Sequence, residues 1–154
     1  MSVPDAPTAV TTYDVRTVPG DGAIADAHAV RRAVFIEGQG VSEAEEIDGR
    51  DADAFHVVVY DREDGRPVGT TRLREVDSHA KVERVAVRAA YRGAGLGRTL
   101  MDIVEGRARR NGHDEAVLHA QTDVEGFYRA LGYETVSGVF TEAAIPHVEM
   151  RKKL

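Results

Sequence analysis

The chain has 154 residues, 42% of them hydrophobic, which is enough for one domain with a substantial core. It contains no cysteine, and this excludes disulfides, cysteine nucleophiles and zinc sites made of thiolates. The formal net charge of −6 argues against general nucleic-acid binding, which requires a basic surface. No apolar run is long enough to span a membrane and the N-terminus lacks an export pattern, so we expect a cytoplasmic protein with no membrane and no nucleic-acid partner.

Strands joined by turns, with two short helices among them, are predicted for the first half of the chain. Residues 1–10 carry prolines and small polar side chains, so we expect a flexible arm there and one domain over residues 11–154. Apolar residues at helical spacing predict a helix from residue 24 to the glycines at 38–40, and Ser42 with Glu45 forms a capping-box pattern for a second helix. Apolar stretches separated by turn residues predict strands over 13–18, 55–60, 68–76 and 81–87, with turns at 19–22, 61–65 and 77–79.

The second half alternates strands with helices. A glycine-rich turn follows the strand at 81–87 and leads into a helix that ends near Arg110, where Asn111 and Gly112 supply a stop signal. The remaining predicted elements are a strand over 116–120, a helix over 124–131 and strands over 133–136 and 148–150. Strands in the first half of the chain are joined by hairpins, and those in the second half by strand–helix crossovers. This order predicts an α/β fold, a mixed sheet with helices on both faces.

The glycine-rich turn predicts a phosphate site, because the first N–H groups of a helix are unpaired and the helix dipole is positive there. The dinucleotide-binding pattern fails, since its third glycine position is occupied by Arg98. The nucleotide P-loop fails as well, because its first glycine position is Arg92 and its lysine is missing. What remains is the pattern Arg-x-x-Gly-x-Gly, from Arg92 to Gly97.

A second motif covers residues 126–134 and has the sequence Gly-Phe-Tyr-Arg-Ala-Leu-Gly-Tyr-Glu. Phe127, Ala130 and Leu131 fall on one face of a helix by their spacing, and Gly132 suits the left-handed position after its end. Tyr128 has two interpretations, an ordinary residue at a helix–sheet junction or a catalytic group. The upstream loop favours the catalytic one.

The two motifs together resemble the GNAT superfamily of acyl-CoA N-acyltransferases, the first its pyrophosphate-binding loop and the second its F-Y-x-x-L-G-[FY] signature. The order of elements after residue 10 also resembles the GNAT fold. Segments at 32–41, 46–48, 118–121 and 145–147 resemble the ElaA-like branch. That branch usually has glycine where this chain has Ala144, a departure that affects the local backbone and the substrate pocket.

The resemblance implies an N-acetyltransferase that moves an acetyl group from acetyl-CoA to a primary amine by direct attack, without a metal. It places the pantetheine arm of the cosubstrate along Val85, Ala86 and Val87. It places the pyrophosphate on Arg92, Gly93, Ala94, Gly95, Leu96, Gly97 and Arg98. In this assignment Tyr128 protonates the departing thiolate.

The base is not decided by the sequence. Glu83 lies on the cofactor strand where several family members place an acidic or water-organising residue, and pairing of this glutamate with a neighbouring arginine is an equal alternative. His119 lies at the end of the strand beside the expected cleft, and imidazole exchanges protons near neutral pH. His56 and His147 are expected to be structural, and no His-x-His or His-x-x-x-His spacing supports a zinc site.

The identity of the acceptor is not decided by the sequence either. The acidic clusters at 43–46 and 48–53 are expected at the solvated surface, with attraction of a cationic amine as the alternative. A small amine is the first expectation for the acceptor, followed by a protein N-terminus or lysine. A non-catalytic acyl-CoA-binding sensor is the rival from another class. The chain is compatible with a monomer or a homodimer.

Overall fold

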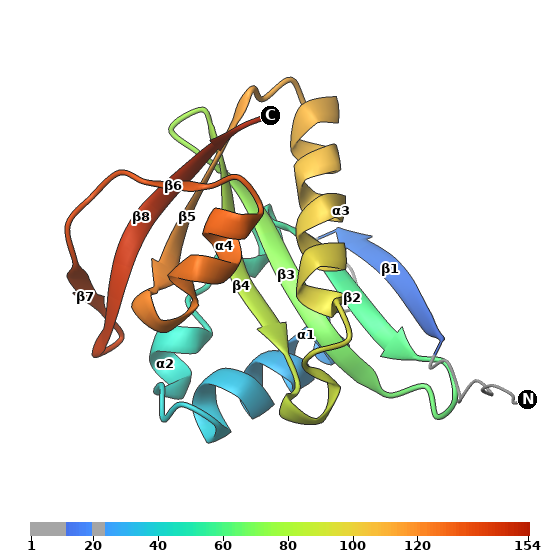
Figure 1. Ribbon diagram of the computed structural model, residues 1–154. Helices are drawn as coiled ribbons and strands as arrows, with labels where there is room; N and C mark the ends of the chain where they lie inside the picture. Colours follow the sequence, from blue (N-terminus) through green and yellow to red (C-terminus); the bar gives the residue numbers. More distant parts are fainter. Residues whose placement is uncertain (1–11, 20–23) are drawn as a thin grey trace, which may run out of the picture.

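The structure is a computed structural model that describes residues 12–19 and 24–154. Its eight-stranded mixed sheet has the order β1-β2-β3-β4-β5-β8-β6, with β7 also paired to β8 (Figure 1). Every neighbouring pair is antiparallel except β4 and β5. The strands are β1 (Tyr13–Pro19), β2 (Phe55–Asp61), β3 (Pro67–Val76), β4 (His79–Val87), β5 (Glu115–Gln121), β6 (Glu134–Thr135), β7 (Phe140–Glu142) and β8 (Ile145–Lys153).

Helices cover both faces of the sheet, as the sequence predicts. Figure 1 shows α3 and α4 in front of the strands, with α1 and α2 behind them. The helices are α1 (Ala25–Arg31), which continues through Arg32–Glu37 as a π-helix, α2 (Glu43–Glu46), α3 (Leu96–Arg110) and α4 (Glu125–Ala130). None of the described helices is long and apolar enough to cross a membrane.

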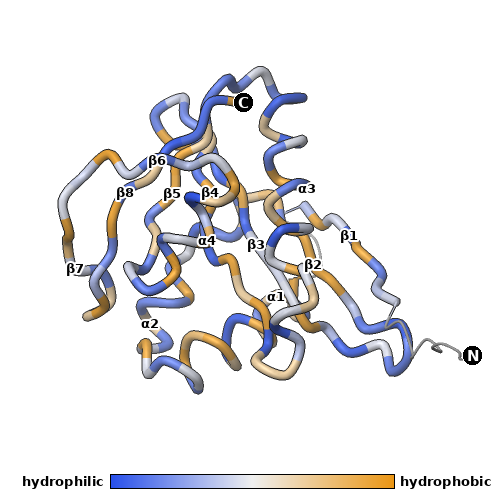
Figure 2. The backbone as a smooth tube through the Cα atoms, in the orientation of Figure 1, coloured by the Kyte–Doolittle hydropathy of each residue, from blue (hydrophilic) through white to orange (hydrophobic). Residues whose placement is uncertain are grey.

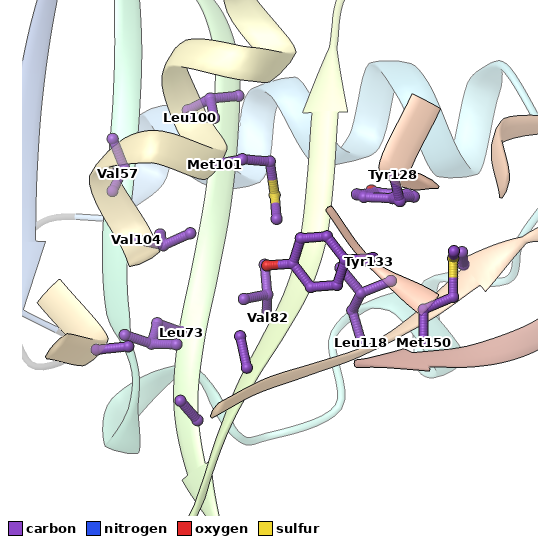
Figure 3. Close-up of a cluster of buried hydrophobic side chains, with 14 of the residues drawn as sticks. Val57, Leu73, Val82, Leu100, Met101, Val104, Leu118, Tyr128, Tyr133 and Met150 are labelled. Carbon is purple, nitrogen blue, oxygen red and sulfur yellow. The ribbon is translucent and has the colours of Figure 1, made fainter. Parts of the chain in front are cut away.

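The larger hydrophobic cluster lies under α3 and α4. In Figure 3, Leu100 and Met101 of α3 lie over the strands, and the ring of Tyr133 lies close to Val82 and Leu118. Figure 2 shows hydrophobic stretches along β2 and β4, whereas the turn between β2 and β3 is hydrophilic. A smaller cluster under α1 consists of Val30, Val34 and Ala86, with Phe35 packed against it. The strand expected to hold the cofactor therefore contributes side chains to both clusters.

Most predicted elements are confirmed, with small differences at their ends. Ser42 caps α2 as predicted, since its hydroxyl accepts a hydrogen bond from the N–H of Glu45 at 3.2 Å. The turn at 77–79 is shorter than predicted, because Asp77 and Ser78 alone take positive φ and His79 already belongs to β4. β7 was not predicted, and β8 is longer than predicted. The predicted arm at 1–10 and most of the turn at 19–22 lie outside the described residues.

Candidate functional site

β4 and β5 separate after a short stretch of parallel pairing. Residues 80–82 of β4 pair with 116–118 of β5, and the two strands are not paired beyond Val82. β4 continues to pair with β3 on its other side up to Val87. The backbone of the segment 83–87, which includes the predicted pantetheine contacts Val85, Ala86 and Val87, therefore has a free edge. An extended ligand can add to such an edge as a further strand.

A bulge at Arg84 accompanies the separation. Arg84 has a φ of +57°, and the pairing register between β3 and β4 shifts between Thr70 and Arg72. Such a bulge bends a strand and increases its twist. The guanidinium of Arg84 forms ion pairs with Glu46 at 3.0 Å and with Asp48 at 3.3 Å, so contacts with the α2 segment hold a backbone conformation that arginine rarely takes.

The glycine loop leads from this free edge to the N-terminus of α3. Gly93 and Gly95 have φ of +86° and +80°, and a Cβ atom at either position would meet nothing within 4 Å. No side chain caps the helix, so its first N–H groups point into open space, as an anion site requires. Gly97 differs, because a Cβ atom there would lie 3.0 Å from the ring of Phe127. This glycine lets α4 approach α3.

Two arginines flank the loop. Arg92 is folded back, and its Nε donates to the carbonyl of Val87 at 3.1 Å. Arg98 lies in the first turn of α3 and forms no ion pair with a described residue. Both guanidiniums keep N–H groups free for charge-assisted hydrogen bonds to phosphate.

Tyr128 lies on the inner face of α4, with 8% of its surface exposed. Its ring meets the ring of Phe127 edge to face, with a centroid distance of 5.0 Å. It meets the ring of Tyr133 in the same way at 6.0 Å, and Figure 3 shows these two tyrosines. The hydroxyl has no hydrogen-bond partner among the described residues. Burial raises the pKa of the Tyr128 phenol, so the group keeps its proton at neutral pH and can donate it.

The residues that share one face of this helix by their spacing are not all buried. Phe127 is 38% exposed and Ala130 is exposed, whereas Tyr128 is buried and Leu131 packs against the core. The helix is only six residues long, and its direction is set by packing on Tyr133 and on Gly97 of α3.

His119 lies on the opposite face of the sheet from Tyr128. Ala116, Leu118 and Ala120 of β5 point into the cluster under α3 and α4, and since side chains alternate along a strand, His119 points toward the other face. Its Nδ1 is 3.0 Å from Glu142 and its Nε2 is 3.4 Å from Glu149. The hydrogen bond with His119 lowers the pKa of Glu142. The candidate acid and this candidate base thus lie on the two faces of the strands that border the gap.

The structure does not support Glu83 as the base. Its carboxylate pairs with Arg72 at 2.9 Å, with Arg74 and with Lys81 at 3.4 Å. Although desolvation of this buried carboxyl opposes ionisation, these cations lower its pKa to about 2, which leaves it a weak proton acceptor. The alternative interpretation was an exposed glutamate paired with a neighbouring arginine. The pairing is present, but the Glu83 side chain is only 11% exposed.

The acidic clusters were expected at the surface, and this was wrong for two of their members. Glu46 and Asp51 are 3% and 7% exposed, and both pair with the buried guanidinium of Arg31. Asp51 also pairs with the buried Arg72 at 3.0 Å. Buried arginines need such partners, and no local pattern in the sequence marks Arg31 and Arg72 as buried.

His56 and His147, the other two histidines considered for the site, both form hydrogen bonds with backbone carbonyls, and His147 also lies 3.8 Å from Glu142. His56 is fully buried, and its Nε2 is 3.0 Å from the carbonyl of Asp51. Burial lowers the pKa of His56 and keeps it neutral. His147 forms a hydrogen bond with the carbonyl of Ile145 at 2.7 Å. Within residues 12–19 and 24–154, no three histidine, aspartate or glutamate side chains are placed to hold a metal ion.

Comparisons with known proteins agree with this geometry. The family model of the acetyltransferase (GNAT) domain matches residues 25–154. The uncharacterized N-acetyltransferase YjcF of Bacillus subtilis is 41% identical over 128 residues, covering 82% of this chain and 90% of that protein. The uncharacterized protein YyaT of the same species is 38% identical over 144 residues, covering 92% and 96%.

Solved structures share the fold. Escherichia coli ElaA has a TM-score of 0.78 at 24% identity, covering 92% of this chain and 99% of that one. A GNAT acetyltransferase from Elizabethkingia anophelis, solved with acetyl-CoA bound, has a TM-score of 0.69 at 14% identity, covering 92% and 98%. The expected likeness to ElaA is confirmed for the fold. With its open β4 edge, its glycine loop and a family match over five sixths of its length, the chain belongs to the GNAT family of acetyltransferases.

Proposed function

We propose that this protein transfers the acetyl group of acetyl-CoA to the nitrogen of a primary amine, with Tyr128 as the acid and His119 as the base. The observation that carries the proposal is the continuity of the free β4 edge with the glycine loop and the uncapped N-terminus of α3. This arrangement suits a ligand with an extended amide-containing arm and a pyrophosphate, as coenzyme A has. A GNAT relative in the same fold binds acetyl-CoA.

The free edge of β4 and the glycine loop bind different parts of coenzyme A. Backbone groups of Val85 and Ala86 are available to the amides of the pantetheine arm. The carbonyl of Val87 joins them once the side chain of Arg92 turns from it to the pyrophosphate. N–H groups of the loop and of the first turn of α3 receive the pyrophosphate, with Arg92 and Arg98 adding charge. The open space above Gly93 and Gly95 lets the phosphates come close to the backbone.

The reaction needs one proton removed and one supplied. The amine nitrogen attacks the thioester carbon, the C–S bond breaks, the nitrogen loses a proton and the thiolate gains one. The hydrogen bond between Nδ1 of His119 and Glu142 orients the ring, and Nε2 takes the proton from the acceptor side. Tyr128 gives a proton to the thiolate from the other face. Burial raises the pKa of this phenol, and a thiolate that forms in the same buried surroundings becomes more basic for the same reason.

The carboxylates around His119 favour a cationic acceptor. Glu142 and Glu149 are 44% and 29% exposed at their side chains, so they can attract an ammonium group to this face of the sheet. A small amine or a peptide amine satisfies this requirement equally. The sensor alternative predicts acetyl-CoA binding without turnover.

A panel of amines and peptides, incubated with acetyl-CoA and followed by release of free thiol, tests the proposal. Acetyl-CoA should raise the melting temperature, since a ligand that binds only the folded state stabilises it. Turnover with any amine supports the transferase. A thermal shift without turnover across the panel supports the sensor, and no thermal shift at saturating acetyl-CoA refutes both.

A further inference from the structure

A cavity of about 450 Å³ lies on the α1 face of the sheet, beside the glycine loop. Its wall is formed by the end of the α1 segment and by the stretch from Arg88 to Arg92. Val34 lines it and belongs to the same cluster as Ala86 of the free β4 edge. Gln39 also lines it, and its side chain forms hydrogen bonds with Gln121 at the end of β5. The cavity therefore adjoins the gap between β4 and β5.

Three arginines meet in this cavity: Arg66, Arg88 and Arg92. No carboxylate of the described residues lies within 4.0 Å of any of the three guanidiniums, although the protein carries a net charge of −6. Among the described residues, the Arg88 guanidinium donates one hydrogen bond, from its Nε to the carbonyl of Pro67 at 2.7 Å. Burial first and then the charge of Arg66 lower the pKa of Arg88, and the opposing charge of Glu37 offsets this only in part.

Three carboxylates lie around the cavity, and none of them forms an ion pair with these guanidiniums. Glu37 acts on Arg88 only from beyond 4.0 Å, whereas Asp61 and Asp64 form other hydrogen bonds. Asp61 accepts hydrogen bonds from the hydroxyl of Tyr91 at 2.8 Å and from the N–H of Glu63 at 2.9 Å. Asp64 accepts from the backbone N–H of Arg66, not from its guanidinium. Arg66 and Arg92 are exposed and Arg88 is half-buried, so water can solvate them, but all three direct free guanidinium N–H groups at one cavity. Such a set of donors can bind an anion through charge-assisted hydrogen bonds.

We infer that this cavity binds an anionic group, a carboxylate or a phosphate, with Arg66 and Arg88 as its ligands. The inference rests on the proposed function, which places the reacting molecules in the adjoining gap. Two molecules can supply the anion by the same chemistry. The first is an acceptor that carries an acid group as well as its amine, and the second is coenzyme A through its 3′-phosphate.

Substrate pairs separate the two sources. The acceptor series consists of ω-amino carboxylates of increasing length, each beside its uncharged amide, and the cosubstrate pair is coenzyme A and dephospho-coenzyme A. An acceptor site predicts that the wild type prefers carboxylates over amides in kcat/KM by roughly tenfold or more, the usual scale of a hydrogen bond to a charged group. A 3′-phosphate site predicts the same scale of preference for coenzyme A over dephospho-coenzyme A in equilibrium binding.

Arg66→Gln and Arg88→Gln should abolish whichever preference is found. Arg62→Gln is the matched control, because Arg62 lies on the same hairpin and loses the same charge but pairs with Asp14 outside the cavity. A preference that survives in both cavity variants overturns the inference, as does a wild type without either preference.

A direct measurement keeps the result independent of the proposed function. Inorganic phosphate, titrated into the wild type, should shift the NMR signals of the Arg66 and Arg88 guanidiniums, and Arg88 should lose this response in the Arg66→Gln variant. If coenzyme A does not bind but phosphate shifts these signals, the proposed function fails and the anion site stands. Unmoved signals refute the site even in an active enzyme.

Discussion

Replacing Tyr128 with phenylalanine removes one oxygen atom and should lower kcat by about 10²- to 10⁴-fold, the usual contribution of a general acid. The phenol acts only as the C–S bond breaks, so the affinity for acetyl-CoA should not change. Burial raises the pKa of this phenol, and the hydroxyl has no partner among the described residues, so its proton is free for the thiolate.

The same substitution should leave stability almost unchanged. The ring that packs on Phe127 and Tyr133 is retained, and no protein hydrogen bond is lost. Tyr133→Phe is the matched control, because the buried Tyr133 hydroxyl donates to Glu105 at 2.8 Å. That variant should lose about 1–3 kcal/mol of unfolding free energy, the cost of leaving a buried acceptor short of a donor, and keep its kcat.

The assay uses an acceptor found in the amine panel. Free-thiol release gives kcat, calorimetric titration gives the affinity for acetyl-CoA, and thermal unfolding gives stability for the wild type and both variants. Equal kcat values for Tyr128→Phe and the wild type would refute the acid role. A weakened affinity with intact kcat would make Tyr128 a binding contact and favour the sensor alternative.

The sequence predicted the features that depend on neighbouring residues. The glycine loop, the end of α3 and the cap of α2 are local patterns, and all three are confirmed. Gly132 takes the left-handed conformation predicted after α4, with a φ of +100°. In each case the side chains or glycines that determine the backbone lie within a few residues of it.

The missed features depend on residues far apart in the chain. The bulge at Arg84 is held by Glu46 and Asp48, which lie nearly forty positions away, and no glycine marks it. β7 was missed for a related reason, since the turn between β7 and β8 consists of Ala143 and Ala144, both with positive φ. Alanine gives no turn signal, although the usual glycine of the ElaA-like branch at position 144 fits this conformation.

The sequence predicted which positions belong to the candidate site, but not that Tyr128 and His119 lie on opposite faces of the sheet. The alternation of β5 is sufficient to separate His119 from Leu118, yet which face meets α4 depends on the packing of Tyr128 and Tyr133. The network around Glu83 could not be predicted, because the burial of Arg72 depends on strands and helices brought together only in the folded chain.

Four further outcomes are expected. Gly95→Ala should weaken the thermal shift with acetyl-CoA, whereas Gly112→Ala, with a similar φ of +89° at the other end of α3, should lose similar stability and keep the shift. His119→Gln should lower kcat/KM most at neutral pH and least near the amine pKa of about 10, where the acceptor needs no base, and a loss independent of pH would contradict the base role. Ala144→Gly should raise the unfolding free energy by up to about 1 kcal/mol, because it relieves a φ of +62°, and an unchanged denaturation midpoint would show that the turn is unstrained. Glu83→Gln should be less stable than the wild type at pH 7. The Glu83 pKa is about 2 in the folded protein against an ordinary 4.5, so the folded state binds fewer protons between these values than the unfolded state does. The stability that ionised Glu83 contributes is complete above pH 4.5 and is lost as the pH falls toward 2, so the difference between the two proteins should narrow over that interval. A difference in denaturant midpoint that stays constant there would mean that Glu83 ionises alike in both states, and that its three cations do not hold it.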